Sequence, residues 1–186
     1  MIIGLVGFKQ VGKSTAAKYL EEKYGFTRVN FKDALITELK NNFPNLIQEI
    51  IHFMEKHYWE GKAWTFERLV AEKPPLFRAL MQNFGTEVRR RDDDYYWVRQ
   101  WENTVTGSEN NIVTDDVRFI NEAKSLTNYG GIIIRLERPD VPDGGTHQSE
   151  TEQLSIVADY TISVAQGEHE ELYARLDEII KGNIRL

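Results

Sequence analysis

The chain has 186 residues, of which 41% are hydrophobic and none is cysteine, so it can bury a core without disulfides and has no thiolate site. Its net charge of −6 disfavours a protein that mainly binds nucleic-acid polymers, because such proteins are usually basic. No apolar run approaches the ~18 residues of a membrane span, and the first residues lack the pattern of a signal peptide. We therefore expect a soluble, intracellular protein that uses no membrane, and its oligomeric state is left open, a homodimer included.

The first predicted elements are a strand, a helix and a second strand. Residues Ile2–Val6 form a short apolar run that ends at Gly7, as in a buried strand of a parallel sheet. A helix is predicted over Lys13–Tyr24, with Gly25 as its stop, and a weaker strand follows at 26–31. A strand, a helix and a strand in this order form a βαβ unit.

The next segment, from about residue 32 to residue 105, differs in character. Apolar residues recur there at helical spacing, and Pro44, Pro74 and Pro75 divide the segment into pieces. We interpret it as a mainly helical insertion.

Beyond the insertion, strands and helices alternate again. Strands are predicted at 111–114, 131–136 and 160–164, helices at 119–126 and around Leu172 to Ile180, and a Pro/Gly loop at 139–145. This order predicts an α/β three-layer sandwich with a five-stranded parallel sheet, formed as a single domain over residues 1–186.

A phosphate-binding motif follows the first predicted strand. Residues 7–14 match G-x-x-x-x-G-K-[ST], with a buried strand before them and a helix after them. In such a loop the backbone N–H groups point at phosphate oxygens, the lysine reaches the β- and γ-phosphates, and the serine hydroxyl ligates Mg²⁺. We expect the triphosphate to be bound by Gly7, Lys9, Val11, Gly12, Lys13, Ser14 and Thr15, with Mg²⁺ as the cofactor on Ser14.

The motif alone does not separate a kinase from a switch GTPase or a motor ATPase. The N-K-x-D motif of guanine recognition is absent, and a motor would need a longer chain. One sandwich with a helical insertion suits a small-molecule kinase. Two rivals stay open, namely a kinase of another small acceptor, such as dephospho-coenzyme A, and a nucleotide-dependent switch or assembly factor.

Several further segments carry a resemblance to a known family. They are F-K-D-A-L at 31–35, L-M-Q-N-F-G-T-E-V-R-R at 80–90, D-D-V-R-F-I-N-E-A at 115–123, G-G at 130–131, R-P at 138–139 and H-Q-S-E at 147–150. With these and the loop, the sequence resembles the phage-type deoxynucleoside monophosphate kinases, which are related to the adenylate kinase and dephospho-coenzyme A kinase group. The resemblance implies a P-loop kinase that uses Mg²⁺ and transfers the γ-phosphoryl of ATP to a deoxynucleoside 5′-monophosphate, in the host cytoplasm if a phage encodes it.

The resemblance also implies an acceptor site and a lid. Substrate-binding residues would be Asp33, Gln82, Thr86, Glu87, Arg90, Trp97, Asp116, Arg118 and Glu150, and catalytic residues would be Lys13, Asp33, Arg118 and Arg138. A lid at about 138–151 would bring Arg138 over the migrating phosphoryl group. A glycine usually precedes the functional arginine of this pattern. Here Arg89 fills that place, so Arg90 is the match, and Arg89 and Arg91 are its rivals.

A structural role competes with the functional one at several of these residues. Asp115 and Asp116 follow the third strand, where an acid can support Mg²⁺ through water, and the resemblance favours Asp116; the alternative for either is a helix N-cap. The same alternative applies to Asp33, a surface salt bridge is the alternative for Arg118, and core packing is the alternative for Trp97 as a base-stacking residue.

Further alternatives concern the ends of the last two strands. Gln166 follows the fifth strand, where it would pass under the adenine of ATP or belong to a plain turn. Arg135 would cover the end of the fourth strand, and Glu150 would cap the helix that follows the lid.

Overall fold

The computed structural model describes residues 1–58, 60–139 and 151–183, which fold as two compact units. Unit 1 consists of Met1–Phe31 together with Trp101–Leu186, and unit 2 of Lys32–Gln100. Unit 2 falls within the range of about 32–105 expected for the helical insertion. Among the described residues, no helix combines the length and the apolar character that crossing a membrane requires.

A five-stranded sheet forms the centre of unit 1. Its strands are β1 (Ile2–Val6), β2 (Thr27–Arg28), β3 (Ile112–Thr114), β4 (Ile132–Glu137) and β5 (Tyr160–Ser163). Their order is β2-β3-β1-β4-β5, and every pairing is parallel. The predicted five-stranded parallel sheet is confirmed. Because all strands run the same way, their carboxyl ends meet at one edge, where ligand sites of such sheets lie.

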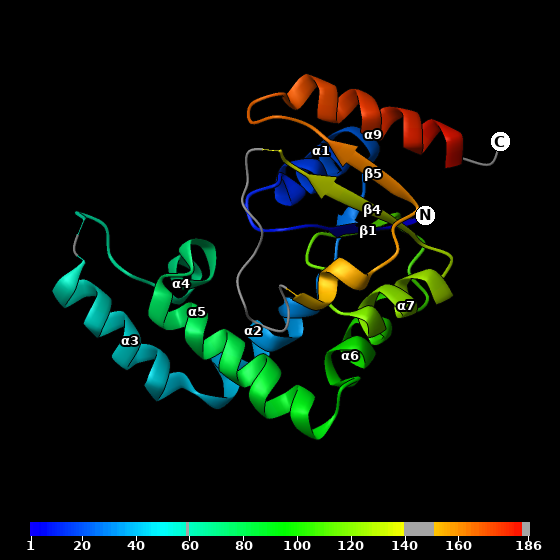
Figure 1. The fold of residues 1–186 in the computed structure, drawn as a ribbon. Helices are drawn as coiled ribbons and strands as arrows, with labels where there is room; N and C mark the ends of the chain where they lie inside the picture. Colours follow the sequence, from blue (N-terminus) through cyan, green and yellow to red (C-terminus); the bar gives the residue numbers. More distant parts are fainter. Residues whose placement is uncertain (59, 140–150, 184–186) are drawn as a thin grey trace. The chain divides into compact units, whose positions relative to one another are not determined.

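Helices cover both faces of this sheet (Figure 1). The helices α1 (Lys13–Tyr24) and α9 (His169–Asn183) lie on one face, and α7 (Ile120–Asn128) lies on the other. Leu20 of α1 and Leu176 of α9 are fully buried in the core between the helices and the sheet. On the opposite face, a Cβ on Gly4 would come within 2.7 Å of Leu126 Cδ1, so the glycine lets α7 approach β1 closely. The predicted three-layer sandwich is therefore confirmed.

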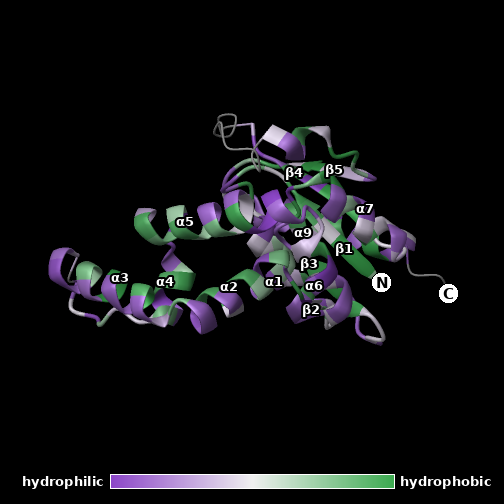
Figure 2. Cartoon of the chain, turned by 90° about the horizontal axis from the view of Figure 1, so that it is seen from below, coloured by the Kyte–Doolittle hydropathy of each residue, from purple (hydrophilic) through white to green (hydrophobic). Residues whose placement is uncertain are grey.

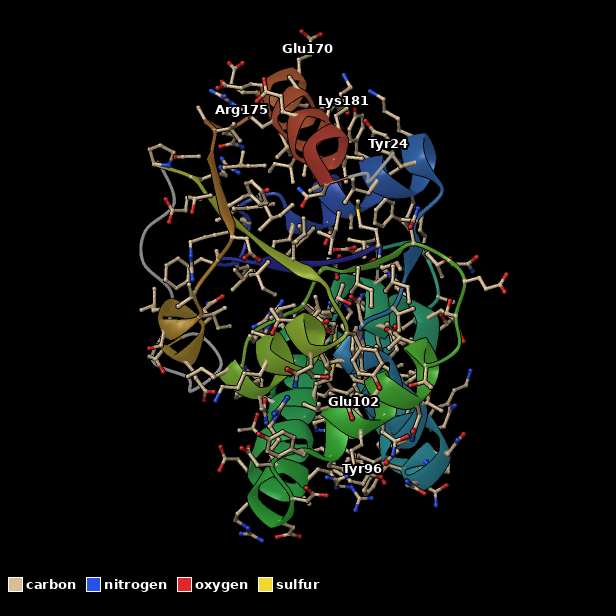
Figure 3. The ribbon with its side chains drawn as sticks, turned by 90° about the vertical axis from the view of Figure 1, so that its right-hand side faces the viewer. Tyr24, Tyr96, Glu102, Glu170, Arg175 and Lys181 are labelled. Carbon is tan, nitrogen blue, oxygen red and sulfur yellow. The ribbon has the colours of Figure 1, made fainter. Side chains whose placement is uncertain are left out.

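The carboxylate of Asp177 joins α1 to α9. It accepts hydrogen bonds from the Tyr19 hydroxyl at 2.9 Å, the Tyr24 hydroxyl at 2.8 Å and the Lys23 ammonium at 2.6 Å. The hydrogen bond from Lys23 is the main cause that lowers the pKa of Asp177 to about 2. The opposite side of α9 projects its charged side chains outward, as Figure 3 shows for Glu170, Arg175 and Lys181.

Unit 2 is helical, as the periodicity predicts. Its helices are α2 (Phe31–Asn42), α3 (Pro44–His57), α4 (Phe66–Glu72), α5 (Pro75–Gln82), η1 (Asn83–Arg90) and α6 (Tyr96–Val105), of which α2 begins and α6 ends in unit 1. Hydrophobic and hydrophilic residues alternate along α3 in Figure 2. Ile47, Ile50 and Met54 form its buried face, which packs against Leu69 and Phe77 in one apolar cluster.

One element differs from what the sequence predicts, and a second has a helix type that the sequence does not specify. The second strand is shorter than 26–31, because the Phe31 N–H donates to Asp116 Oδ1 at 3.1 Å and opens α2 instead of extending the ladder. Residues Asn83–Arg90 form a π-helix rather than an α-helix. Over eight residues the pattern of apolar residues does not distinguish a π-helix from an α-helix. Within this helix, the Gly85 carbonyl accepts a hydrogen bond from the Trp97 indole N–H at 2.9 Å.

Candidate functional site

The phosphate-binding loop connects β1 to α1, as predicted. Gly7, Gln10 and Gly12 adopt φ values of 145°, 69° and 101°, so the backbone turns sharply over a few residues. A Cβ on Gly7 would come within 2.3 Å of the Leu136 backbone oxygen, so only glycine lets the loop pass this close to β4. The loop leads into the N-terminal end of α1, whose N–H groups and positive dipole favour phosphate.

The Lys13 side chain lies over this loop. Its Nζ donates to the backbone oxygens of Gly7 at 2.5 Å and Phe8 at 2.6 Å. Val11 is buried in the core at 3% exposure, so it anchors the loop to the rest of unit 1. Ser14 and Lys9 are exposed and point away from that core. The loop therefore presents a cation and a hydroxyl beside the helix terminus that favours phosphate.

The first arginine after β4 reaches the same loop. Arg138 Nη1 donates to the Gln10 backbone oxygen at 2.8 Å. Its neighbour Arg135 has a different role, because its Nη2 donates to the backbone oxygens of Gln153 at 3.1 Å and Ile156 at 2.6 Å. Arg135 lies within β4 and holds the short helix η2 (Glu152–Ser155) and the residue after it.

The two aspartates after β3 are held differently. Asp115, at 4% exposure, is paired with Arg28 Nη1 at 3.2 Å, and its own N–H donates to Asn30 Oδ1 at 2.9 Å. Asp116 accepts the N–H of Phe31, the first residue of α2. The α7 helix has Phe119 as its N-cap, so neither aspartate caps the helix that follows it in the chain.

The donor set at these strand ends fits Mg²⁺. Mg²⁺ prefers oxygen ligands and in phosphate sites takes one or two from the protein and the others from water and phosphate. The Ser14 hydroxyl opens α1 after β1, and the Asp116 carboxylate follows β3, the parallel neighbour of β1. Among the described residues, no group of three or more His, Cys, Asp or Glu side chains forms an all-protein metal site.

Arg118 lies between β3 and α7, at the carboxyl edge of the sheet. Its backbone N–H donates to Glu122 Oε2 at 2.8 Å, and the Phe119 N–H donates to the same oxygen at 3.2 Å. Glu122 therefore holds the connection that carries Arg118. The role of the Arg118 guanidinium on the acceptor stays a prediction.

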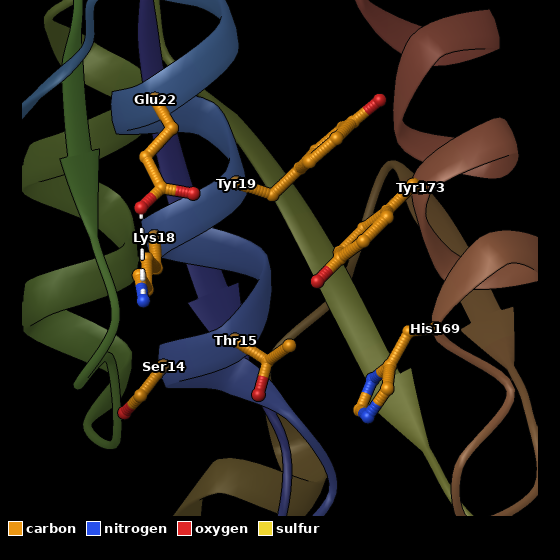
Figure 4. Close-up of a pocket in the computed structure, with 7 residues that line it drawn as sticks. All are labelled: Ser14, Thr15, Lys18, Tyr19, Glu22, His169 and Tyr173. Carbon is orange, nitrogen blue, oxygen red and sulfur yellow. Dashed lines mark ion pairs between the residues drawn. The ribbon is translucent and has the colours of Figure 1, made fainter.

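A pocket of about 390 Å³ lies beside the loop, between α1 and α9 (Figure 4). Its lining residues are Ser14, Thr15, Lys18, Tyr19, Glu22, His169 and Tyr173. The rings of Tyr19 and Tyr173 stack with their centroids 3.9 Å apart and 4° between their planes. The His169 ring continues this stack, 6.2 Å from Tyr173, and lies at the same end of the pocket as Thr15 in Figure 4.

Sequence reasoning did not single out His169, Tyr173 or Lys18. The sequence of α1 did contain a signal for its side of the pocket. Thr15, Lys18 and Glu22 follow the loop at helical spacing, so they share one face of the helix. No such signal existed for α9, because nothing local indicates that it lies beside α1. Gln166 lies in an exposed turn just before α9, where the Glu168 N–H donates to the Ala165 oxygen at 3.3 Å, and its role on adenine stays a prediction.

The predicted acceptor residues of unit 2 lie on α2, on η1 and beside it. Asp33 stands inside the first turn of α2, two residues after the helix begins, so it is not an N-cap. Gln82 ends α5, and Thr86, Glu87 and Arg90 belong to η1. The structure thus places most of these residues on two consecutive helical elements of one unit.

Trp97 of α6 lies in the core of unit 2. Its ring is 3% exposed and packs against Phe84 and Tyr96, and its N–H is bound to Gly85. This placement favours the core alternative over base stacking.

The three consecutive arginines of η1 and its end have distinct surroundings. Arg89 is paired with Glu38, with Nη2 and Oε2 3.0 Å apart. Arg90 is 8% exposed and donates from Nη1 to the Asp94 backbone oxygen at 3.2 Å. Arg91 is exposed and lies 3.5 Å from the Asp92 carboxylate. Arg89 and Arg90 thus both have partners within the protein, and Arg90 as the phosphate ligand stays a prediction. Glu150 and residues 140–150 of the expected lid lie outside the described residues.

This protein belongs to the class of P-loop nucleotide-binding α/β proteins. The class is defined by its parallel sheet, by the loop after the central strand and by the arginine that binds that loop. No family model matches the chain. A mimivirus protein (Acanthamoeba polyphaga mimivirus) described as "Putative deoxynucleotide monophosphate kinase" is 30% identical over 197 aligned positions, which cover 95% of this chain and 94% of that protein.

Solved structures similar to this chain include two bacterial kinases. The shikimate kinase of Aquifex aeolicus gives a TM-score of 0.49 at 13% identity and covers 98% of both chains. The dephospho-CoA kinase of Campylobacter jejuni gives 0.43 at 16% identity, again covering 98% of both chains. The family assignment rests on the sequence relative: this chain belongs to the deoxynucleotide monophosphate kinase family and is an ATP-dependent phosphotransferase. The family resemblance drawn from the sequence is confirmed.

Proposed function

We propose that the protein transfers the γ-phosphoryl group of ATP to a deoxynucleoside 5′-monophosphate and releases the two diphosphates. The observation that carries this proposal is the P-loop, which holds Lys13 and is bound by Arg138, in a chain of this family. The name of the mimivirus relative supports a deoxynucleotide acceptor. We place the reaction in the cytoplasm, that of a host cell if the gene is viral, in keeping with the viral relative and with a chain that lacks cysteine.

The donor nucleoside would occupy the pocket between α1 and α9. A triphosphate bound by the loop continues past Thr15 toward its nucleoside, and Thr15 is one of the residues that line the pocket. A volume of about 390 Å³ lies within the range of small-molecule sites. The stacked rings of Tyr173 and His169 offer flat apolar surfaces beside polar edges, which suit a base and a ribose.

The acceptor would be bound by the residues that the family resemblance assigns to it. Arg90 and Arg118 supply the cations for its phosphate, because guanidinium groups bind phosphate oxygens with two N–H donors. Asp33, which is exposed on the first turn of α2, would orient the acceptor. Gln82, Thr86 and Glu87 would line the base, and Asp116 would support both metal and acceptor.

The chemistry needs positioning and charge neutralisation more than proton transfer. The attacking oxygen of a nucleoside monophosphate is already anionic, so no strong general base is required. Lys13 and Arg138 would neutralise the charge that spreads over the migrating phosphoryl group. Mg²⁺ bound by Ser14 and Asp116 would supply further neutralisation of the β- and γ-phosphate oxygens.

A substrate panel tests this function. The protein is incubated with ATP and Mg²⁺ together with each deoxynucleoside monophosphate, each ribonucleoside monophosphate, dephospho-coenzyme A or shikimate, and ADP formation is measured. We expect at least one deoxynucleoside monophosphate to raise ADP formation well above the ATP-only control. Stoichiometric ATP binding without acceptor-dependent turnover would point instead to a switch or assembly factor, and turnover with dephospho-coenzyme A alone would point to the other kinase.

A further inference from the structure

Three side chains from separate elements of unit 2 meet around one carboxylate. Glu38 lies on α2, Arg89 on η1 and Tyr96 at the start of α6. Arg89 donates to Glu38 Oε2 from Nε at 3.1 Å and from Nη2 at 3.0 Å, and the Tyr96 hydroxyl donates to Glu38 Oε1. Both oxygens of Glu38 are therefore bound. These three residues are called the Glu38 clasp below.

Aromatic rings restrict the Arg89 side chain further. Its guanidinium carbon lies 5.2 Å from the ring centre of Phe84 and 5.1 Å from that of Tyr96. Both distances fall within the ≈ 6 Å range of cation–π contacts. The position of Arg89 is thus set by a carboxylate and by two rings, one of which, Phe84, belongs to η1 itself.

An apolar cluster lies under the same three elements. Leu35 and Leu39 of α2 pack there against Phe84 of η1 and Trp97 of α6. This cluster accounts for the association of the elements. Because the side chains of Glu38 and Arg89 are 20% and 38% exposed, their ion pair adds little to stability. Its directional contacts instead fix how the end of η1 is oriented on α2.

The clasp joins the two elements that carry the proposed acceptor residues. Asp33 lies five residues before Glu38 on α2, which is more than one helical turn, and Arg90 is the neighbour of Arg89 on η1. The π-helical geometry of η1 makes an external restraint useful, because π-helices are rare and mostly occur as single turns at functional sites.

We infer that Glu38, Arg89 and Tyr96 are positioning residues of the acceptor site, which orient η1 so that Arg90 binds the acceptor phosphate. This inference rests on the proposed function. In this inference Arg89 positions Arg90, which is the phosphate ligand, and does not itself contact the phosphate. Loss of the clasp therefore weakens acceptor binding while the ATP site of unit 1 is untouched.

Steady-state kinetics of Glu38→Gln and Arg89→Met test the inference. Each variant is expected to raise KM for the deoxynucleoside monophosphate on the order of tenfold, because small misplacements of a binding group are costly. KM for ATP should stay within about twofold. The double variant should resemble either single one, since both changes remove the same contact. Arg99→Met is the matched control, because Arg99 of α6 is an exposed arginine of the same unit that is paired with Asp93.

The outcomes separate this inference from the proposed function. An active wild type whose acceptor KM is unchanged in both variants, or whose two KM values rise together, overturns the clasp alone. If the wild type shows no deoxynucleotide-dependent turnover, the proposed function fails, and amide hydrogen exchange then decides the clasp. Faster exchange over residues 83–90 in Glu38→Gln supports it, and unchanged exchange overturns it. Tyr96→Phe, which removes only a hydroxyl, gives the same exchange comparison should Glu38→Gln not fold.

Discussion

Arg138 and Gln10 are 128 positions apart in the sequence, yet Arg138 Nη1 donates a hydrogen bond to the Gln10 backbone oxygen at 2.8 Å. The contact exists because β4 pairs with β1, so the residue after β4 lies beside the loop after β1. This relationship supports Arg138 as the cation that neutralises the phosphoryl group. We expect Arg138→Met to lower kcat on the order of 10²-fold without unfolding, because one charge-stabilising donor is lost. Arg175→Met on the outer side of α9 is the control, and equal kcat losses in both variants would contradict the role of Arg138.

Lys13→Met should abolish most of the activity. The two hydrogen bonds described for its ammonium go to the loop's own backbone, at Gly7 and Phe8. We expect kcat to fall on the order of 10³-fold and the circular dichroism spectrum to match the wild type. Turnover retained by the Lys13→Met variant would show that this loop is not the ATP site.

Asp115→Asn and Asp116→Asn should have different effects. Asp116→Asn is expected to raise the Mg²⁺ concentration for half-maximal activity on the order of tenfold, because it weakens the support of the metal. Asp115→Asn should instead lower the free energy of unfolding by about 1–3 kcal/mol, because Arg28 loses a buried partner. Magnesium titrations and urea unfolding of both variants measure these two effects. Identical behaviour of the variants would show that the two carboxylates do not have separate roles.

The aromatic wall of the pocket should affect ATP and not the acceptor. Tyr173→Leu and His169→Ala each remove a ring of the stack beside Thr15. We expect KM for ATP to rise by about three- to tenfold, which corresponds to the ≈ 0.5–1.5 kcal/mol of an aromatic contact. KM for the deoxynucleoside monophosphate should not change. An unchanged KM for ATP in both variants would exclude the pocket as the nucleoside site.

The hydrogen bonds of Asp177 should make stability depend on pH in the acid range. The folded state holds the pKa of Asp177 at about 2, below its ordinary value of 3.8. The contribution is therefore complete above about pH 4 and is lost as the pH falls toward 2. We expect Asp177→Asn to lower the free energy of unfolding by about 1 kcal/mol at pH 7, a figure reduced for partial exposure. Urea unfolding from pH 7 to pH 2 measures this difference, which should shrink in acid. A difference that stays constant with pH would contradict it.

Features that depend on neighbours along the chain could be predicted before the structure was known. The run Ile2–Val6, the loop at 7–14 and the helix Lys13–Tyr24 were predictable, because a buried strand, a phosphate-binding turn and a helix each leave a local pattern. The helical character of unit 2 was predictable for the same reason.

Contacts between residues far apart in the sequence depend on the folded arrangement of the strands and helices. The order β2-β3-β1-β4-β5 brings Arg138 to Gln10, and Asp115 to Arg28, through strand pairings that no local pattern specifies. Packing also placed Trp97 in a core. These arrangements come from burial and hydrogen bonding between elements far apart in the chain, whereas propensity and periodicity report on a few neighbouring residues.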